Sequence, residues 1–216
     1  MPQMKRGRMP DAPLLWNQYK TLREKKQPRV TPMPPSQYHL LAELYSAFRD
    51  KDIRELRRIN DKSASSIAVE FDQSIYDISI LSYILAKLVS KPRFWSNPDS
   101  KANLTKVRAI LREASEQSRR GDTTAVAGSL QAAFSQIRKI ESADRRFISD
   151  FEQKAKLKLA STLYAQGFSL GNAANVTGVE KREILSYAGK TMMFDRLKSE
   201  LAMGERLKRI RKIFKA

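Results

Sequence analysis

The segment that follows Gly178 carries polar side chains of the kind that can read nucleic-acid bases. An arginine pairs with guanine through two hydrogen bonds, and a serine hydroxyl bonds either a base or a phosphate. At the start of a helix, such side chains reach base edges in the major groove of DNA. Glu183 either accepts a hydrogen bond from cytosine or pairs with a nearby lysine. The predicted base-facing residues are Glu180, Lys181, Arg182 and Ser186.

Two short helices joined by a tight turn would position these side chains. Ser169 predicts the N-cap of the first helix, and Gly178 predicts the turn, because glycine adopts a positive φ without steric cost. An alanine before that glycine fits where the helices cross, since only a small side chain has room there. The spacing favours a DNA-binding helix-turn-helix, and the alternative is a packing corner or a protein-contact motif. The predicted motif residues are Ala173, Ala174, Gly178, Val179 and Ile184, with Val176 and either Tyr187 or Leu185 closing the core.

The segment LYAQGFSLGNAANVTGVEKREILSYAGK, residues 163–190, resembles a known family. It is similar to the short archaeal and bacterial antitoxin-like proteins of uncharacterised protein family 175. Those proteins carry a leucine-rich helix, a glycine and then an SLG-x-AA-x-x-x-G helix-turn-helix. The resemblance covers only these residues, and it implies a DNA-binding regulatory role, sometimes with a toxin partner.

The charge of the chain also indicates a polyanionic partner. The 216 residues include 41 lysines and arginines against 23 acidic residues, which gives a formal net charge of +18. Self-repulsion of this size is costly unless a polyanion offsets it. Nucleic acid is the first candidate and an anionic membrane surface the second, while a merely solubilising surface is the third.

Residue types that the sequence lacks exclude several kinds of catalytic site. The chain has no cysteine and one histidine, His39, so it offers no thiolate nucleophile, no disulfide and no histidine-rich metal site. We therefore expect no enzyme, no cofactor and no metal. Residues 67–89 are the most apolar stretch, but four charged residues make it too polar to span a membrane. The basic N-terminus lacks the apolar core of a signal peptide, so we expect a soluble intracellular protein.

Proline, glycine and charge divide the chain into four predicted parts. Residues 1–35 form a basic, proline-rich flexible arm, and residues 36–142 form a helical body. Residues 143–190 contain a long helix and the helix-turn-helix. Residues 191–216 form a basic C-terminal helix, for which three binding partners are open: nucleic acid, a partner or dimer mate, or a membrane surface. The candidate phosphate contacts in the two ends are Lys5, Arg6, Arg8, Arg206, Lys208, Arg209, Arg211 and Lys212.

Apolar residues at helical spacing predict an all-α fold, a helical bundle with a C-terminal helix-turn-helix and basic flexible termini. Ser36 is expected to cap the first helix of the body. Because residues 36–91 lack both proline and glycine, they favour long helices, with a short one at 53–59 and a central one at 63–90 whose buried stripe includes Phe71. Residues 91–100 are expected to be a loop. Helices at 102–120 and 123–140 form an antiparallel hairpin around Gly121, and a further helix spans 144–166.

Two other clusters leave alternatives open. The carboxylates Glu70, Asp72 and Asp77 could do acid–base chemistry, although we expect them to pair with arginines. The aromatic residues Phe94 and Trp95 beside an arginine could stack on unpaired bases or plug the end of the bundle.

Together these patterns favour a non-catalytic nucleic-acid-binding protein that prefers duplex DNA to RNA. The expected role is that of a transcriptional regulator or chromatin-associated factor in the cytoplasm, associated with the nucleoid. A homo-oligomer or a protein partner is possible in this role, because helix-turn-helix proteins commonly bind as dimers. The alternatives are an RNA- or ribosome-associated protein with basic arms, and a scaffold subunit of a larger complex.

Overall fold

A computed structural model describes residues 35–143 and 150–193 of the chain. These residues form nine α-helices and contain no strand, which confirms the predicted all-α class. They all lie within one compact unit, Met33–Ala216. Residues 1–34 of the predicted arm, residues 194–216 of the predicted C-terminal helix and all eight candidate phosphate contacts lie outside the described residues. The helices are α2 (Pro35–Arg49), α3 (Ile53–Val69), α4 (Gln73–Val89), α5 (Pro92–Ser96), α6 (Pro98–Arg119), α7 (Thr123–Ala143), α8 (Phe151–Ala165), α9 (Leu170–Thr177) and α10 (Lys181–Lys190).

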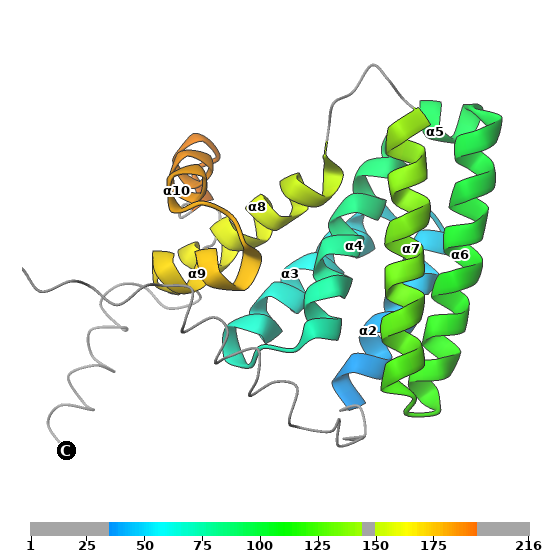
Figure 1. Cartoon of the computed structure of the whole chain (residues 1–216), viewed down its shortest axis with the longest axis horizontal. Coiled ribbons are helices and arrows are strands. Elements are labelled where there is room, and N and C mark those ends of the chain that lie inside the picture. The colour runs from blue at the N-terminus through cyan, green and yellow to red at the C-terminus, as the bar shows by residue number, and fades with distance from the viewer. Residues whose placement is uncertain (1–34, 144–149, 194–216) are drawn as a thin grey trace, which may run out of the picture. The chain divides into compact units, whose positions relative to one another are not determined.

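Helix α4 lies at the centre of the fold. It contacts α2, α3, α7 and α8 (Figure 1), and side chains such as Ile78, Leu81 and Leu85 are fully buried. A helix that is apolar on nearly every side must be covered on nearly every side. Helix α4 therefore takes the central place that the sequence analysis gave to a helix over residues 63–90, but it covers only the C-terminal part of that range.

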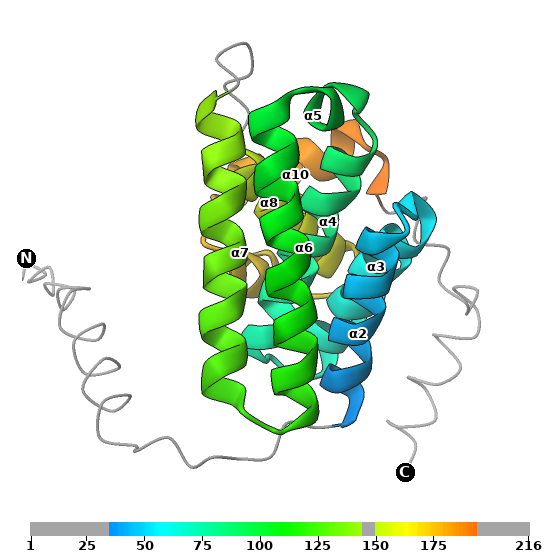
Figure 2. The same cartoon turned by 90° about the vertical axis from the view of Figure 1, so that its right-hand side faces the viewer.

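Helices α6 and α7 form the predicted antiparallel hairpin (Figure 2). Gly121 turns the chain with a φ of 76°, and the Asp122 carboxylate caps α7 by accepting the Ala125 N–H at 2.9 Å. Helix α6 starts four residues earlier than predicted. The Asn97 side chain accepts the Ser100 N–H at 3.0 Å, and Pro98 occupies the first helical position, where no N–H is needed.

The prediction of one helix over residues 63–90 is wrong, because residues 70–72 interrupt the helix and separate α3 from α4. Asp72 takes an extended conformation, and its carboxylate accepts the N–H groups of Ser74 at 2.8 Å and Ile75 at 3.0 Å. This N-cap starts a new helix without proline or glycine. Phe71 lies at the break and is 50% exposed instead of buried.

Two other predicted helix boundaries differ from the structure. Asp52 caps α3 by accepting the Arg54 N–H at 2.9 Å, so this helix starts at Ile53 as predicted, but it continues to Val69 and does not end at Ile59. At the first helix of the body, α2 already begins at Pro35, so Ser36 lies within the helix and not at its cap.

The predicted loop at 91–100 contains a short helix, α5, that closes one end of the bundle. Phe94 is buried, and its ring lies 6.0 Å from the Phe151 ring. Trp95 packs 6.2 Å from Phe48, and the Lys51 ammonium lies 3.9 Å from the centre of the Trp95 ring. These aromatic side chains therefore plug the bundle, and Phe94 is not free to stack on bases.

The expectation that Asp77 pairs with an arginine is also wrong. Its side chain is buried between α4 and α7, where the Gln73 amide donates to it at 3.0 Å and the Gln131 amide at 3.5 Å. Burial raises the pKa of the Asp77 carboxyl, and the two amide hydrogen bonds only partly oppose that rise.

Replacing Asp77 with asparagine should therefore stabilise the protein at neutral pH. Because the folded state holds this proton more tightly than the unfolded state, the stability of the wild type falls as the pH rises through the folded pKa. The asparagine side chain would carry no charge to bury, so melting curves should place the variant above the wild type at neutral pH. The difference should shrink on acidification.

The exposed residue Asp61 provides a control, because Asp61→Asn should change the free energy of unfolding by no more than about 0.5 kcal/mol. A wild type that melts above Asp77→Asn at neutral pH would show that the buried carboxylate is stabilising.

Candidate nucleic-acid interface

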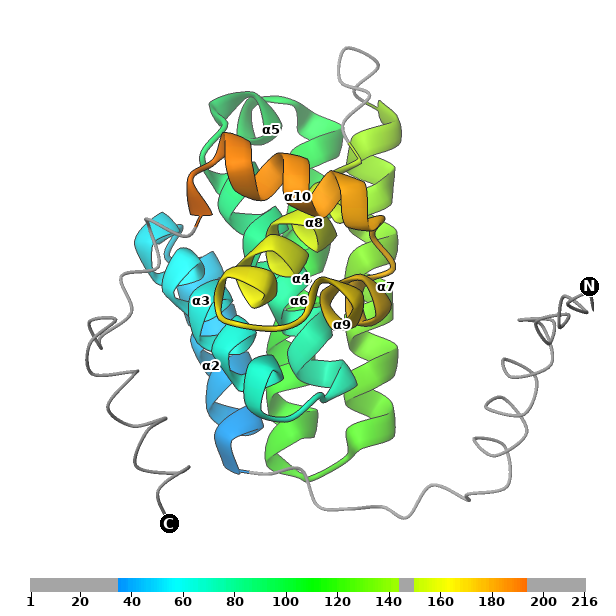
Figure 3. The same cartoon turned by 90° about the vertical axis from the view of Figure 1, so that its left-hand side faces the viewer.

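The helix-turn-helix predicted from the sequence is the second half of a three-helix unit. Helices α8, α9 and α10 contact one another, and α8 also packs against α3 and α4. In Figure 1, α9 and α10 lie on the side of the fold opposite to the α6–α7 hairpin, and Figure 3 looks directly at α10. The three-helix unit therefore rests on the bundle through α8.

Polar contacts hold α8 at its start. Asp150 caps the helix by accepting the Gln153 N–H at 2.9 Å, so α8 begins at Phe151 and not at 144 as predicted. Residues 144–149 lie outside the described residues. Although burial works against it, the pKa of Glu152 is lowered by its hydrogen bonds to Lys156 and Arg138. The Arg138–Glu152 pair, at 3.0 Å, connects α7 to α8.

The predicted turn has the geometry that its sequence requires. Ser169 caps α9 by accepting the Asn172 N–H at 3.1 Å. Gly178 adopts the left-handed conformation, with φ 70° and ψ 16°, and its N–H donates to the Ala174 carbonyl at 2.8 Å. The Thr177 hydroxyl donates to the Ala173 carbonyl at 2.8 Å, which keeps a polar group satisfied within the motif.

The motif core forms largely as the sequence predicts. Ala173, Val179 and Ile184 are buried, whereas Ala174 and Val176 are half-buried at its edge. Either Tyr187 or Leu185 was expected to close this core. Tyr187 is half-buried and Leu185 is 47% exposed, so Tyr187 is the residue that closes it. The burial of a small alanine and of the aliphatic residues fixes how α10 lies on α8 and α9.

The predicted base-facing residues are all exposed. Glu180 is the N-cap residue of α10 and makes no side-chain cap hydrogen bond. Because Ile184 and Ala188 point inward, the residues one position before and after each lie toward solvent or at the flanks. We define the outer face of α10 as Lys181, Arg182, Leu185, Ser186 and Gly189, all of them exposed.

Leu185 is a candidate contact residue that the sequence analysis did not place at the interface. It lies three residues after Arg182 and four after Lys181, so it shares their face. An exposed leucine in this position can contact the methyl group of thymine. The signal was present in the sequence, because Ile184 and Ala188 together set which side of α10 is buried.

A hollow of about 370 Å³ lies along the flank of α10 toward α8. Arg182 and Lys190 line it from one helix and Leu157 from the other, together with Ser186 and the exposed carboxylate of Glu183. Arginine presents five N–H donors in a fixed planar arrangement, which suits bidentate contacts to phosphate or guanine. The flank thus continues the polar surface of the outer face.

Fold and site together define an all-α bundle that carries a three-helix helix-turn-helix unit. No protein-family model, no curated protein and no solved structure matches the chain. The resemblance of residues 163–190 to the antitoxin-like family therefore stays a prediction.

Two further properties concern the described part of the chain. No group of three or more histidine, cysteine or acidic side chains within residues 35–143 and 150–193 could hold a metal ion. In the same ranges, every helix is too short or too polar to cross a bilayer.

Proposed function

We propose that the protein binds duplex DNA, with α10 as the recognition helix in the major groove. The observation that carries this proposal is the left-handed Gly178 turn, which holds α10 with its inner face buried and its outer face exposed. Lys181, Arg182 and Ser186 supply hydrogen-bond donors on that face, and the net charge of +18 supports attraction to a phosphate backbone. Lys181 and Arg182 lie in the first turn of α10, where recognition helices contact bases, and Ser186 follows one turn later.

The proposed role is non-catalytic, that of a transcriptional regulator or chromatin-associated factor. A protein with this role would be cytoplasmic and associated with the nucleoid. A homo-oligomer would present two recognition helices to two half-sites, as helix-turn-helix dimers do. An RNA- or ribosome-associated protein, or a scaffold subunit, takes the place of this proposal if α10 does not contribute to DNA binding.

Alanine at Lys181 or Arg182 should weaken DNA binding without unfolding the protein, because both side chains are exposed. Loss of a bidentate base contact should cost about 1–3 kcal/mol and relax sequence preference at one position. Loss of a phosphate contact should weaken binding to all sequences and reduce the log–log salt slope by about 0.9. Affinities for duplexes of selected and random sequence, measured at several salt concentrations, separate the two outcomes.

The matched controls remove a lysine and an arginine elsewhere, one at a time. Lys106 and Arg108 are exposed on α6, and this helix lies on the side of the fold opposite to α10 (Figure 1). The single variants Lys106→Ala and Arg108→Ala should each bind DNA almost as the wild type does. Equal affinity of Lys181→Ala, Arg182→Ala and these controls, each with an unchanged melting curve, would show that the motif is a packing corner.

A further inference from the structure

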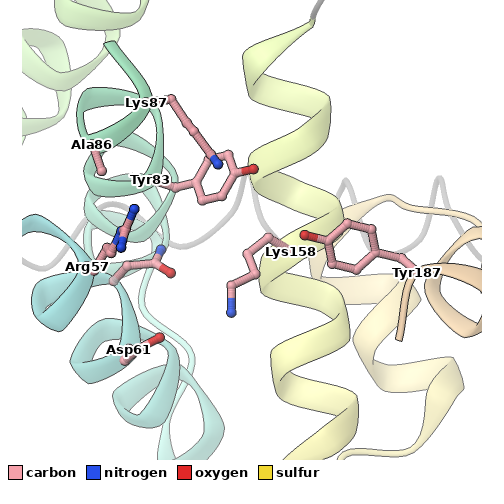
Figure 4. A pocket seen from close by; sticks show the side chains of 8 residues that line it. Arg57, Asp61, Tyr83, Ala86, Lys87, Lys158 and Tyr187 are labelled. Carbon is pink, nitrogen blue, oxygen red and sulfur yellow. The ribbon is translucent and has the colours of Figure 1, made fainter. Parts of the chain in front are cut away.

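A second hollow, of about 390 Å³, opens between α3, α4, α8 and α10. Figure 4 shows side chains of α3 and α4 on one side of it and those of α8 and α10 on the other. Its volume lies in the range of small-molecule sites in proteins. The outer face of α10 is not part of this hollow, which meets α10 only through Tyr187.

Cationic side chains from three helices line this hollow. Arg57 comes from α3, Lys87 from α4 and Lys158 from α8, while Asp61 is the one carboxylate among the described residues that line it. Lys158 is half-buried and hydrogen-bonded to the Thr162 hydroxyl at 3.2 Å, so its ammonium group is held in place. Three cations against one carboxylate leave an excess of positive charge, which suits an anion with more than one negative charge.

Two tyrosines add hydrogen-bond donors and flat apolar surface. Tyr83 belongs to α4 and Tyr187 to α10, and they come from opposite sides of the hollow (Figure 4). Burial, together with the neighbouring Tyr187, raises the pKa of Tyr83 to about 12, so its hydroxyl keeps its proton at physiological pH. The Lys87 ammonium lies 5.4 Å from the centre of the Tyr83 ring, which places this cation beside the aromatic surface.

We propose that this hollow binds a small phosphomonoester of the size of a mononucleotide. Its phosphate would lie among Arg57, Lys87 and Lys158, because charge-assisted hydrogen bonds to phosphate are the strongest polar contacts available there. A ring attached to the phosphate would pack on the tyrosines, and Asp61 would accept hydrogen bonds from hydroxyl groups of the ligand. The net charge of the lining matches that of a phosphate dianion.

Occupancy of this hollow would also influence α10. Tyr187 follows the outer-face residue Ser186 directly, so a ligand that contacts Tyr187 acts on the helix proposed to read DNA. If the two sites are coupled, the ligand changes DNA affinity by the same factor by which DNA changes ligand affinity. This consequence rests on the proposed function, whereas the binding site itself does not.

The test uses the full chain and two probes, adenosine 5′-monophosphate and inorganic phosphate, in titration calorimetry at low ionic strength without DNA. Arg57→Gln and Lys87→Gln remove single cations from exposed positions, so both variants should fold. Each should weaken binding of the mononucleotide about tenfold, equivalent to about 1.4 kcal/mol. The controls Arg108→Gln and Lys106→Gln remove the same side-chain types from α6 and should leave binding unchanged.

Several outcomes would overturn the inference. One is that neither the mononucleotide nor inorganic phosphate binds saturably. Another is that the α6 controls lose as much mononucleotide affinity as the pocket variants do. Pocket variants that weaken duplex DNA binding but leave mononucleotide binding unchanged would show that the DNA backbone is the occupant. Because the main titration contains no DNA, its failure is distinguishable from a failure of the proposed DNA-binding function.

Discussion

Ile184→Ala will release α10 from the three-helix unit and weaken DNA binding by at least about tenfold, or about 1.4 kcal/mol. Ile184 is fully buried where α10 packs against α8 and α9. Truncation of a buried isoleucine to alanine costs about 2–5 kcal/mol of unfolding free energy. Because the lost contacts belong to a small peripheral unit, the loss should appear as local opening, with α4 in the bundle still protected.

Hydrogen exchange of the backbone amides measures this effect helix by helix. Amides of α10 should exchange faster in Ile184→Ala, while those of α4 should change little. The next residue provides the control, because Leu185 is 47% exposed. Leu185→Ala should change unfolding free energy by less than about 0.5 kcal/mol. Unchanged protection of α10 together with unchanged DNA affinity in Ile184→Ala would contradict the proposed interface.

Gly178→Val will lower both the melting temperature and the DNA affinity, with a cost of about 1–3 kcal/mol. Gly178 has a φ of 70°, a conformation that a β-branched residue adopts only with strain. Apart from its own chain neighbours, no described residue lies within 4 Å of the position that a Cβ would occupy at Gly178. The expected cost is therefore a backbone cost and not a collision.

Gly178→Asn separates these two causes, since asparagine tolerates the left-handed conformation although it carries a side chain. Its melting curve should lie close to that of the wild type. Calorimetric melting of the three proteins, with DNA affinity measured in parallel, tests the turn directly. A Gly178→Asn variant that is as unstable as Gly178→Val would show that the space around the turn is decisive.

The sequence by itself determined the elements whose ends are set by nearby residues. Ser169 caps α9 and Gly178 ends it, and the chain turns at Gly121 between α6 and α7, as predicted. Such caps and turns act over about four residues, so their signals can be read locally. The all-α class followed for the same reason, because helical spacing of apolar residues is a local property.

The break at residues 70–72 was missed because neither glycine nor proline marks it. An aspartate can either continue a helix or cap one, and Asp72 caps α4. The local sequence is compatible with both choices. The packing of α3 against α4 distinguishes them, since these helices can contact each other only if the chain turns between them.

Tertiary structure alone decided which side chains meet. Arg57, Lys87, Lys158 and Tyr187 line one hollow although they come from four helices spread over most of the chain. Packing also placed Phe94 against Phe151 in the core and left Leu185 on the outer face of α10. Burial depends on which element covers a residue, and a partner element distant in sequence leaves no mark on the local pattern. The sequence therefore determined the helices and the turn of the motif, and the tertiary structure determined the surfaces they form together.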